Sequence, residues 1–371
     1  TDDQLRLLKQ LINDLLAGKA PAFLGDHARL IDDYFRQSYE KSVVGPKMDI
    51  AKNPYAVVAL GGFMIPALIE NGYPEKYTLG LMTTSPNLGV IIPPSIGMIL
   101  YSMISNVSLE GLFLTGFVPG MLIMLLVCLY SFFFFRNKKE IVRKPIPSFK
   151  DTLAVFREGF WSLMLPVIIF GGIFSGVFTA NEAAVVACVY AFIVELFIHK
   201  SMKFSQVKQI TVNSAVTSAT LLIIVAGATC FGRLLTLEDI PGRITETVLS
   251  AITSPFVFLI AMNMLLLIVG MFMDIISATM ILGPVFLPML DAFGISWMHF
   301  GLIMTVNLAI GYCTPPMGVS LYITGAIANK DLIYVSKSVI PFILIQLAVL
   351  FICTYFPDLV LWLPDAMGYL D

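Results

Sequence analysis

Two pairs of prolines interrupt apolar segments of this chain, and oxygen-bearing side chains lie beside both pairs. Proline has no amide hydrogen and its ring clashes with the preceding turn, so each pair must unwind a helix and free backbone carbonyls. Carbonyl, hydroxyl and amide oxygens form the hard ligand set that suits a sodium ion, and nearby glycines let the backbone approach it. The candidate sodium ligands are Ser85, Asn87, Gly89, Pro93, Asn307, Gly311, Thr314 and Gly318, with Pro94 and Pro316 as candidate substrate or tip residues.

A further polar cluster lies in an expected re-entrant hairpin over residues 255–291. Its tip presents Asp274, followed by Ser277 and Thr279 as further candidate sodium ligands. A lone carboxylate between apolar arms is unfavourable unless it is functional or hydrogen-bonded. Asp274 is therefore either a stabiliser of the tip backbone or a ligand of the ion or solute.

The two proline pairs occupy equivalent positions of an internal repeat, because residues 89–94 align with residues 311–316 at an offset of 222. A structural kink would explain one interrupted segment. Two matched segments with polar neighbours favour the binding site of a secondary transporter. The same offset pairs Gly61 with Gly283, Pro66 with Pro288, Gly72 with Gly294 and Pro119 with Pro341.

The composition is that of a membrane protein, with 57% apolar residues, 13% charged residues and a mean hydropathy of +0.85. A soluble enzyme does not need so apolar a chain. The net charge of −2 argues against nucleic acid as a partner, since duplex binding needs a concentrated basic surface. The five cysteines and three histidines show no metal-ligand spacing, so neither a metal centre nor a bound cofactor is expected.

Apolar segments and basic residues together predict the membrane topology. Seven Lys and Arg residues place the connector 136–158 in the cytoplasm, while residues 357–371 carry no Lys or Arg and are expected outside. The two repeat units therefore run in opposite directions. Expected spans are 111–135, 160–178, 182–198, 209–231, 255–273 and 334–356, with interrupted segments at 77–104 and 299–327.

A bend is expected inside the long apolar stretch from residue 160 to residue 198. Thr179 and Glu182 have the spacing of a capping box, in which each side chain binds the other's backbone. Glu182 is accordingly interpreted as a helix cap in preference to a proton carrier.

Four motifs resemble those of a known family: Gly72–Tyr77, Asn87–Ser95, Gly176–Ala184 and Asn307–Gly318. Together they resemble the large membrane subunit of tripartite ATP-independent periplasmic (TRAP) transporters of the dicarboxylate type, over residues of about 57–371. The resemblance implies a sodium-driven importer of organic acids in the bacterial inner membrane. It also implies an elevator motion and two protein partners, a small membrane subunit and a periplasmic solute-binding protein.

The resulting fold class is an all-α polytopic membrane protein, an inverted-repeat elevator-type transporter with an incomplete first repeat. Residues 1–56 are expected to form a soluble, mainly helical foreign or regulatory segment, because they are too polar to span a bilayer. Residues 57–135 are the rest of the first repeat and residues 159–371 the second. By the offset, the polar residues 31–57 stand where an apolar first hairpin arm should lie.

Residues 1–62 have a resemblance of their own, to the lead-in of a uridylyltransferase-like nucleotidyltransferase domain. It rests on residues 27–36 and 53–62. The acidic pair that holds magnesium in that family is missing after Gly61-Gly62, so nucleotide transfer is not expected. A fusion of two genes is the favoured explanation, and a divergent regulatory extension is the alternative.

Three functions remain open at this point. The favoured one is a permease subunit of a binding-protein-dependent importer. The others are a non-transporting truncated fusion product and a sodium/carboxylate symporter that needs no binding protein. Because half of the first hairpin is missing, this chain alone is expected to bind sodium weakly at its first site and to transport little.

Overall fold

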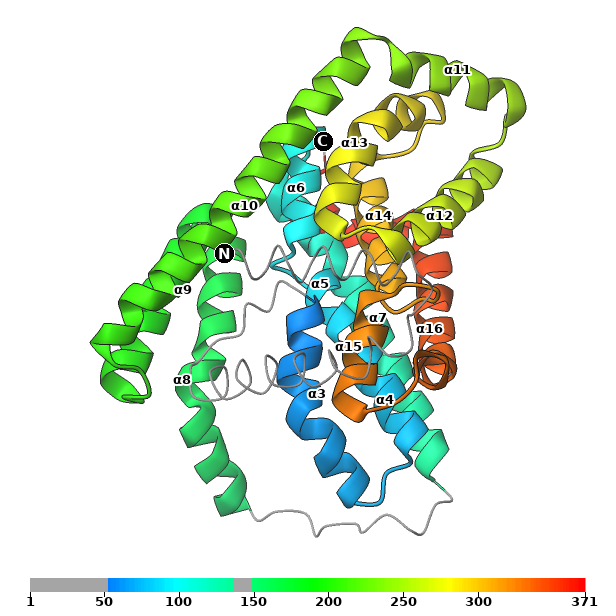
Figure 1. The fold of residues 1–371 in the computed structure, drawn as a ribbon. Helices are drawn as coiled ribbons and strands as arrows, with labels where there is room; N and C mark the ends of the chain where they lie inside the picture. The colour runs from blue at the N-terminus through cyan, green and yellow to red at the C-terminus, as the bar shows by residue number, and fades with distance from the viewer. Residues whose placement is uncertain (1–52, 137–148, 371) are drawn as a thin grey trace, which may run out of the picture. The chain divides into compact units, whose positions relative to one another are not determined.

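The computed structural model describes residues 53–136 and 149–370, in which all regular structure is helical (Figure 1). The described residues divide into two units, one of residues 192–207 and one of residues 53–136, 149–191 and 208–370. Within the described ranges, seven helices are long and apolar enough to cross a membrane. The expectation of an all-α polytopic membrane protein is confirmed.

The helices of the first half are α3 (Asn53–Glu70), α4 (Glu75–Thr84), the 3-10 turn η1 (Ser85–Asn87), α5 (Leu88–Ile91), α6 (Ile96–Ser105) and α7 (Leu109–Phe135). Then come α8 (Phe149–Phe174), α9 (Ala180–Ile193), η2 (Val194–Ile198), α10 (Phe204–Leu237) and α11 (Ile240–Ala251). The last are α12 (Pro255–Phe272), α13 (Ile275–Ala292), α14 (Trp297–Gly311), α15 (Val319–Ala328), α16 (Leu332–Tyr355) and α17 (Pro357–Ala366).

In the first unit, the described residues 192–207 form a helix end and a polar turn. The segment η2 is a π-helix that continues α9. Ser201 donates a hydrogen bond to the carboxylate of Glu195, and His199 Nδ1 lies 3.8 Å from Glu195 Oε1. These contacts close the end of the span predicted at 182–198.

In the second unit, the helix bounds repeat at the offset found in the sequence. Helix α3 corresponds residue for residue to α13, since Asn53 and Glu70 lie 222 positions before Ile275 and Ala292. The first residue of α4 has the same relation to the first residue of α14. The repeat is therefore a repeat of structure as well as of residue types.

Each repeat packs one of its helices against a helix of the other repeat. Helix α3 packs against α15, and its counterpart α13 packs against α6, the counterpart of α15. Both contacts are made at glycines, where the absence of a side chain lets the neighbouring helix come close. If a Cβ were added at Gly61 it would lie 3.5 Å from Ile327 Cδ1, and one added at Gly283 would lie 3.2 Å from Ile104 Cδ1. Such reciprocal packing is what two copies related by a pseudo-twofold axis produce.

Helices α12 and α13 form the hairpin predicted at residues 255–291. Phe258, near the start of α12, stacks on Phe293, directly after α13, with ring centroids 4.3 Å apart. The start of one helix therefore lies beside the end of the other, and the turn at Met273-Asp274 is the tip.

Local sequence signals set several helix starts. Ser95, Ser108 and Ser296 each precede a helix and accept a hydrogen bond from a backbone N–H of its first turn. The predicted capping box is confirmed, because Thr179 N donates to Glu182 Oε2 at 2.9 Å and Glu182 N donates to Thr179 Oγ1 at 3.4 Å.

Helix bounds differ most from the expected spans in α8 and α10. Helix α8 begins at Phe149, inside the predicted connector 136–158, and α10 extends beyond the predicted span 209–231 at both ends. Periodicity alone does not mark these ends, because a helix can continue past its apolar part. The predictions for residues 1–52, including the missing hairpin arm, lie outside the described residues.

Candidate ion and solute site at the two helix breaks

The first break separates α4 from α6. The chain passes from α4 through η1 and the single turn of α5 into an extended link at Ile92, and the Pro93-Pro94 bond is cis. Helix α7 lies directly against this link, because a Cβ at Gly116 would collide with the carbonyl oxygen of Ile91. A second α7 glycine, Gly120, is close to Ile92 in the same way. Small residues one turn apart on α7 thus support the unwound backbone.

The second break separates α14 from α15, and its Pro315-Pro316 bond is also cis. Ser320 N donates to the Tyr312 carbonyl at 3.1 Å, which ties the two sides of the break together. A Cβ at Gly318 would lie 2.8 Å from the Thr314 carbonyl oxygen and 3.0 Å from that of Tyr312. The loop therefore closes around two carbonyls, and only glycine leaves room for them.

The hairpin tip docks on the second break. Ile275 N, at the start of α13, donates to the Tyr312 hydroxyl at 2.9 Å. The other arm of the hairpin, α12, touches the broken helix α14 through Gly270. A Cβ added at Gly311 would lie only 2.6 Å from Gly270 Cα, so the two backbones are in contact. Gly97 of α6 adds a third contact, with its virtual Cβ 2.8 Å from Ile275 Cδ1. The tip thus meets broken helices of both repeats.

Asp274 is the N-cap of α13. Its Oδ1 accepts hydrogen bonds from Ile276 N at 2.9 Å and Ser277 N at 3.0 Å, and its Oδ2 accepts one from Ser277 Oγ at 2.7 Å. The carboxylate is exposed. Of the two roles left open by the sequence, these contacts match the stabiliser of the tip.

Asp274→Ala is expected to lower the free energy of unfolding by about 0.5–2 kcal/mol, because the first turn of α13 loses its cap. Asp274→Asn should keep both stability and sodium affinity, since asparagine caps about as well as aspartate. Thermal unfolding with and without sodium measures both quantities. An asparagine variant that folds normally but loses its sodium response would show that the charge binds the ion.

Asn87, at the first break, joins a buried polar network across the two repeats. Its Nδ2 donates to Gln346 Oε1 of α16 at 2.8 Å, and Gln346 Nε2 donates to the Thr84 carbonyl at 3.3 Å. From the second break, Cys313 Sγ lies 3.1 Å from the Thr83 carbonyl oxygen and 3.4 Å from Asn87 Oδ1. The two breaks therefore meet at Asn87.

Gln346→Leu is expected to lower the free energy of unfolding by about 1–3 kcal/mol, because it removes two buried hydrogen bonds of the first break. Gln209→Leu is the matched control, since Gln209 is exposed and bonds Asn213 on the same helix. Its effect should stay within about 0.5 kcal/mol. Equal effects of the two substitutions, measured by chemical unfolding, would contradict a structural role for Gln346.

Asn307 is the centre of a second network, between the hairpin and the second break. Its Nδ2 donates to Asn263 Oδ1 of α12 at 2.6 Å and to the Ile303 carbonyl at 2.9 Å. Asn263 in turn donates to Thr354 Oγ1 of α16 at 3.3 Å. Asn307 is fully buried, and its Oδ1 has no hydrogen-bond partner within the described part of the chain. A buried acceptor left unpaired is a position where a ligand can bind.

Helix α16 holds both networks. Gln346 and Thr354 lie eight residues apart on it, or about 12 Å along its axis at 1.5 Å per residue. The polar groups at the breaks therefore form two separate clusters, one around Asn87 and one around Asn307.

Comparison with known proteins places this arrangement in a family. Residues 55–359 match the family described as the Tripartite ATP-independent periplasmic transporter, DctM component. The chain belongs to this family. TRAP large permeases are transporters and not enzymes, and the chain is a multi-pass membrane protein of that class.

Individual relatives agree with this assignment. The chain is 38% identical to the C4-dicarboxylate TRAP transporter large permease protein DctM of Pseudomonas aeruginosa over 316 residues, 85% of this chain and 74% of the relative. It is 38% identical to the isethionate TRAP transporter permease protein DctMQ of Oleidesulfovibrio alaskensis, covering 82% of this chain and 48% of the relative. It is 30% identical to the sialic acid TRAP transporter permease protein SiaT of Haemophilus influenzae, covering 83% and 50%. The chain spans about half the length of the last two.

In this TRAP permease the predicted site residues lie at different depths. Some are buried, some half-buried and some exposed. Asn87, Pro93, Thr279, Asn307, Gly311 and Gly318 are buried; Ser85, Gly89, Ser277 and Thr314 are half-buried; Pro94, Asp274 and Pro316 are exposed. Thr314 Oγ1 donates to its own helix at the Ile310 carbonyl, at 2.8 Å.

Four residues of the site were missed from the sequence: Asn263, Tyr312, Gln346 and Thr354. Asn263 and Gln346 carried a usable signal, because each is an amide inside a predicted apolar span. Polar side chains at membrane depth face the protein interior and find partners there. Tyr312 gave no such signal, since an aromatic residue beside a break is compatible with simple packing.

Proposed function

We propose that this chain is the permease subunit of a sodium-coupled importer of organic acids in the bacterial inner membrane. A small membrane subunit and a periplasmic solute-binding protein complete the transporter, and the binding protein delivers the substrate. The family assignment supports the three-part arrangement.

Sodium coupling rests on one observation above the others, the unpaired Oδ1 of the fully buried Asn307. This oxygen lies inside the broken helix α14, where the side chain of Asn307 contacts Asn263 of the hairpin. Amide and carbonyl oxygens are ligands that a hard cation accepts. A bound sodium ion would give Asn307 Oδ1 the electropositive partner that no hydrogen-bond donor of the described chain provides.

The residues around Asn307 explain how an ion could act on the fold. Asn307 belongs to the broken helix, Asn263 to the hairpin and Thr354 to the long helix α16. An ion held by Asn307 would favour the arrangement in which these three elements stay together. Sodium would in this way stabilise one conformation of an elevator-type movement, because a ligand shifts an equilibrium toward the state it binds better.

The substrate class rests on the relatives. Their names refer to C4-dicarboxylate, isethionate and sialic acid, all of which are organic anions. The identities of 30–38% support this class and no single member of it. An anion taken up with sodium does not have to cross the membrane as an isolated charge.

Uptake by proteoliposomes tests the proposal. The chain is reconstituted with its small membrane subunit, and the binding protein is added outside with succinate, isethionate or N-acetylneuraminate. Uptake of at least one anion should require an inward sodium gradient and should stop when potassium replaces sodium. Uptake at equal rates in both salts would overturn the sodium coupling, and uptake without the binding protein would overturn the three-part arrangement.

A further inference from the structure

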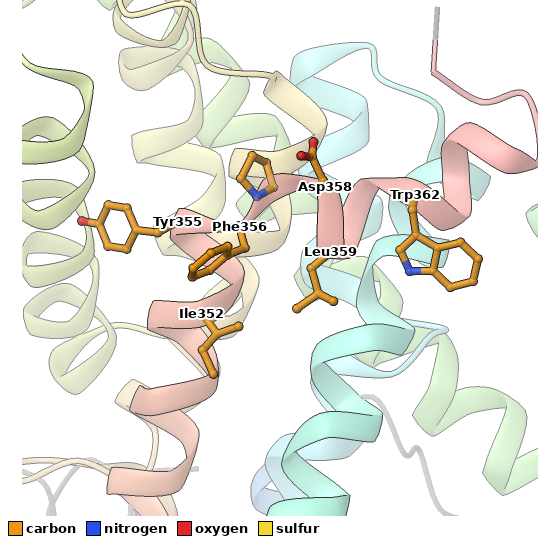
Figure 2. A pocket seen from close by; sticks show the side chains of 7 residues that line it. Ile352, Tyr355, Phe356, Asp358, Leu359 and Trp362 are labelled. Atoms are coloured by element: carbon orange, nitrogen blue, oxygen red, sulfur yellow. The ribbon is translucent and has the colours of Figure 1, made fainter.

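The corner between α16 and α17 is an open hollow of about 650 Å³ (Figure 2). Helix α16 ends at Tyr355, and α17 begins two residues later at Pro357. The hollow is lined mainly by apolar and aromatic side chains, including Ile352, Phe356, Leu359 and Trp362. Its volume is in the range of sites that take a small organic group.

The two faces of α17 differ in character. Val360 and Pro364 are buried, and α17 packs against α7 and α14. On the outer side, the side chains of Leu359 and Trp362 are 39% and 55% exposed. Asp358 also lines the hollow, although its carboxylate points away from Leu359 in Figure 2. The exposed side of α17 therefore combines a carboxylate, an aliphatic side chain and a tryptophan, a mixture of polar and apolar groups typical of a helix lying in the membrane interface.

The hollow continues an exposed apolar stripe along α16. Ile333, Ile340, Leu344 and Phe351 are each at least 50% exposed, and they recur at intervals of seven and four residues along one side of the helix. Helix pairs in membranes meet through small residues, which allow the backbones to approach. This stripe has only large side chains, so its composition fits lipid better than a partner helix.

The charges of residues 357–371 favour one class of lipid headgroup over another. Residues 357–371 contain three aspartates and no lysine or arginine. An anionic headgroup would find no cation there, whereas the ammonium group of a zwitterionic phospholipid is compatible with the aspartates.

We propose that α17 lies in the membrane interface and that an acyl chain of a zwitterionic phospholipid fills the hollow against Phe356, Leu359 and Trp362. The lipid covers apolar surface that the described protein leaves exposed. The inference concerns a lipid contact and does not depend on which anion the transporter carries.

Tryptophan fluorescence tests this contact, because the chain has only three tryptophans. The double variant Trp161→Phe/Trp297→Phe leaves Trp362 as the only one. In nanodiscs of phosphatidylcholine brominated near the ester end of its chains, emission should fall by at least about twofold relative to unbrominated lipid, as expected for an interfacial ring. Bromines near the methyl end should quench less, and aqueous acrylamide should quench weakly.

Two results would overturn the proposal. Strong acrylamide quenching without bromine quenching would place α17 in water. If neither acrylamide nor brominated lipid quenches Trp362, protein covers the corner, either a second copy of this chain or another subunit. If the double variant does not fold, bromine quenching is compared between the original chain and Trp362→Phe. The part of the quenching that disappears with Trp362→Phe is then the part that comes from Trp362. Trp362→Tyr should keep thermal stability in lipid, and Trp362→Glu should lower it.

Discussion

Gly311→Ala is expected to separate the hairpin from the second break and to abolish the sodium response of the protein. A Cβ at this position would lie 2.5–2.7 Å from three backbone atoms of Gly270. Backbone cannot rotate away as a flexible side chain can, so α12 or α14 must move. Overpacking of this kind costs about 1–3 kcal/mol or more, and we expect thermal unfolding to show a loss of that size.

A series of glycine substitutions provides the control. At Gly270 a Cβ would meet its nearest atoms at 3.2–3.3 Å, so Gly270→Ala should have a smaller effect than Gly311→Ala. At Gly171, inside α8, a Cβ would meet nothing within 4 Å. Gly171→Ala should therefore stabilise the protein by about 0.5–1 kcal/mol, the usual gain of alanine over glycine in a helix. An effect of Gly311→Ala that resembles the one at Gly171 would contradict the backbone contact.

Asn307→Leu is expected to weaken sodium binding by at least about tenfold, which corresponds to ~1.4 kcal/mol. The substitution removes the unpaired oxygen and keeps a side chain of similar size. Stability without sodium should fall by about 1–3 kcal/mol, because Nδ2 loses its hydrogen bonds to Asn263 and Ile303, and the further stabilisation that sodium gives the original chain should be lost as well. Thermal unfolding over a range of sodium chloride concentrations, at constant ionic strength, separates the two effects.

The matched control for Asn307 is Asn71, an exposed amide in the turn after α3 that donates a hydrogen bond to the Ala67 carbonyl of that helix. Asn71→Leu should leave sodium affinity unchanged. Asn263→Leu should give an intermediate loss, because the Asn307 oxygen remains while its neighbour is removed. If Asn307→Leu binds sodium as well as the original chain does, this oxygen is not a ligand.

Much of the fold could be predicted from the sequence because the membrane restricts the choices. Apolar length predicts spans, and paired prolines predict breaks, whatever the tertiary packing. The offset between Pro93 and Pro315 also relates the bounds of α3 to those of α13. The capping box at Thr179 was predictable because all its contacts are local.

The assembly of the site was harder to predict. The contact between Asn87 and Gln346 joins residues 259 positions apart, and the contact between Gly270 and Gly311 depends on how two helices approach. Neither follows from local pattern. The sequence named Asn87 and Asn307 together as sodium ligands, whereas the structure places them in separate clusters along α16.

Direct binding of radioactive sodium to the purified chain in nanodiscs tests the central claim most directly. We expect saturable binding that unlabelled sodium displaces and an equal concentration of potassium does not. Asn307→Leu should reduce this binding, and Asn71→Leu should not. Binding that is absent, or that potassium displaces equally well, would contradict a sodium site at the helix breaks.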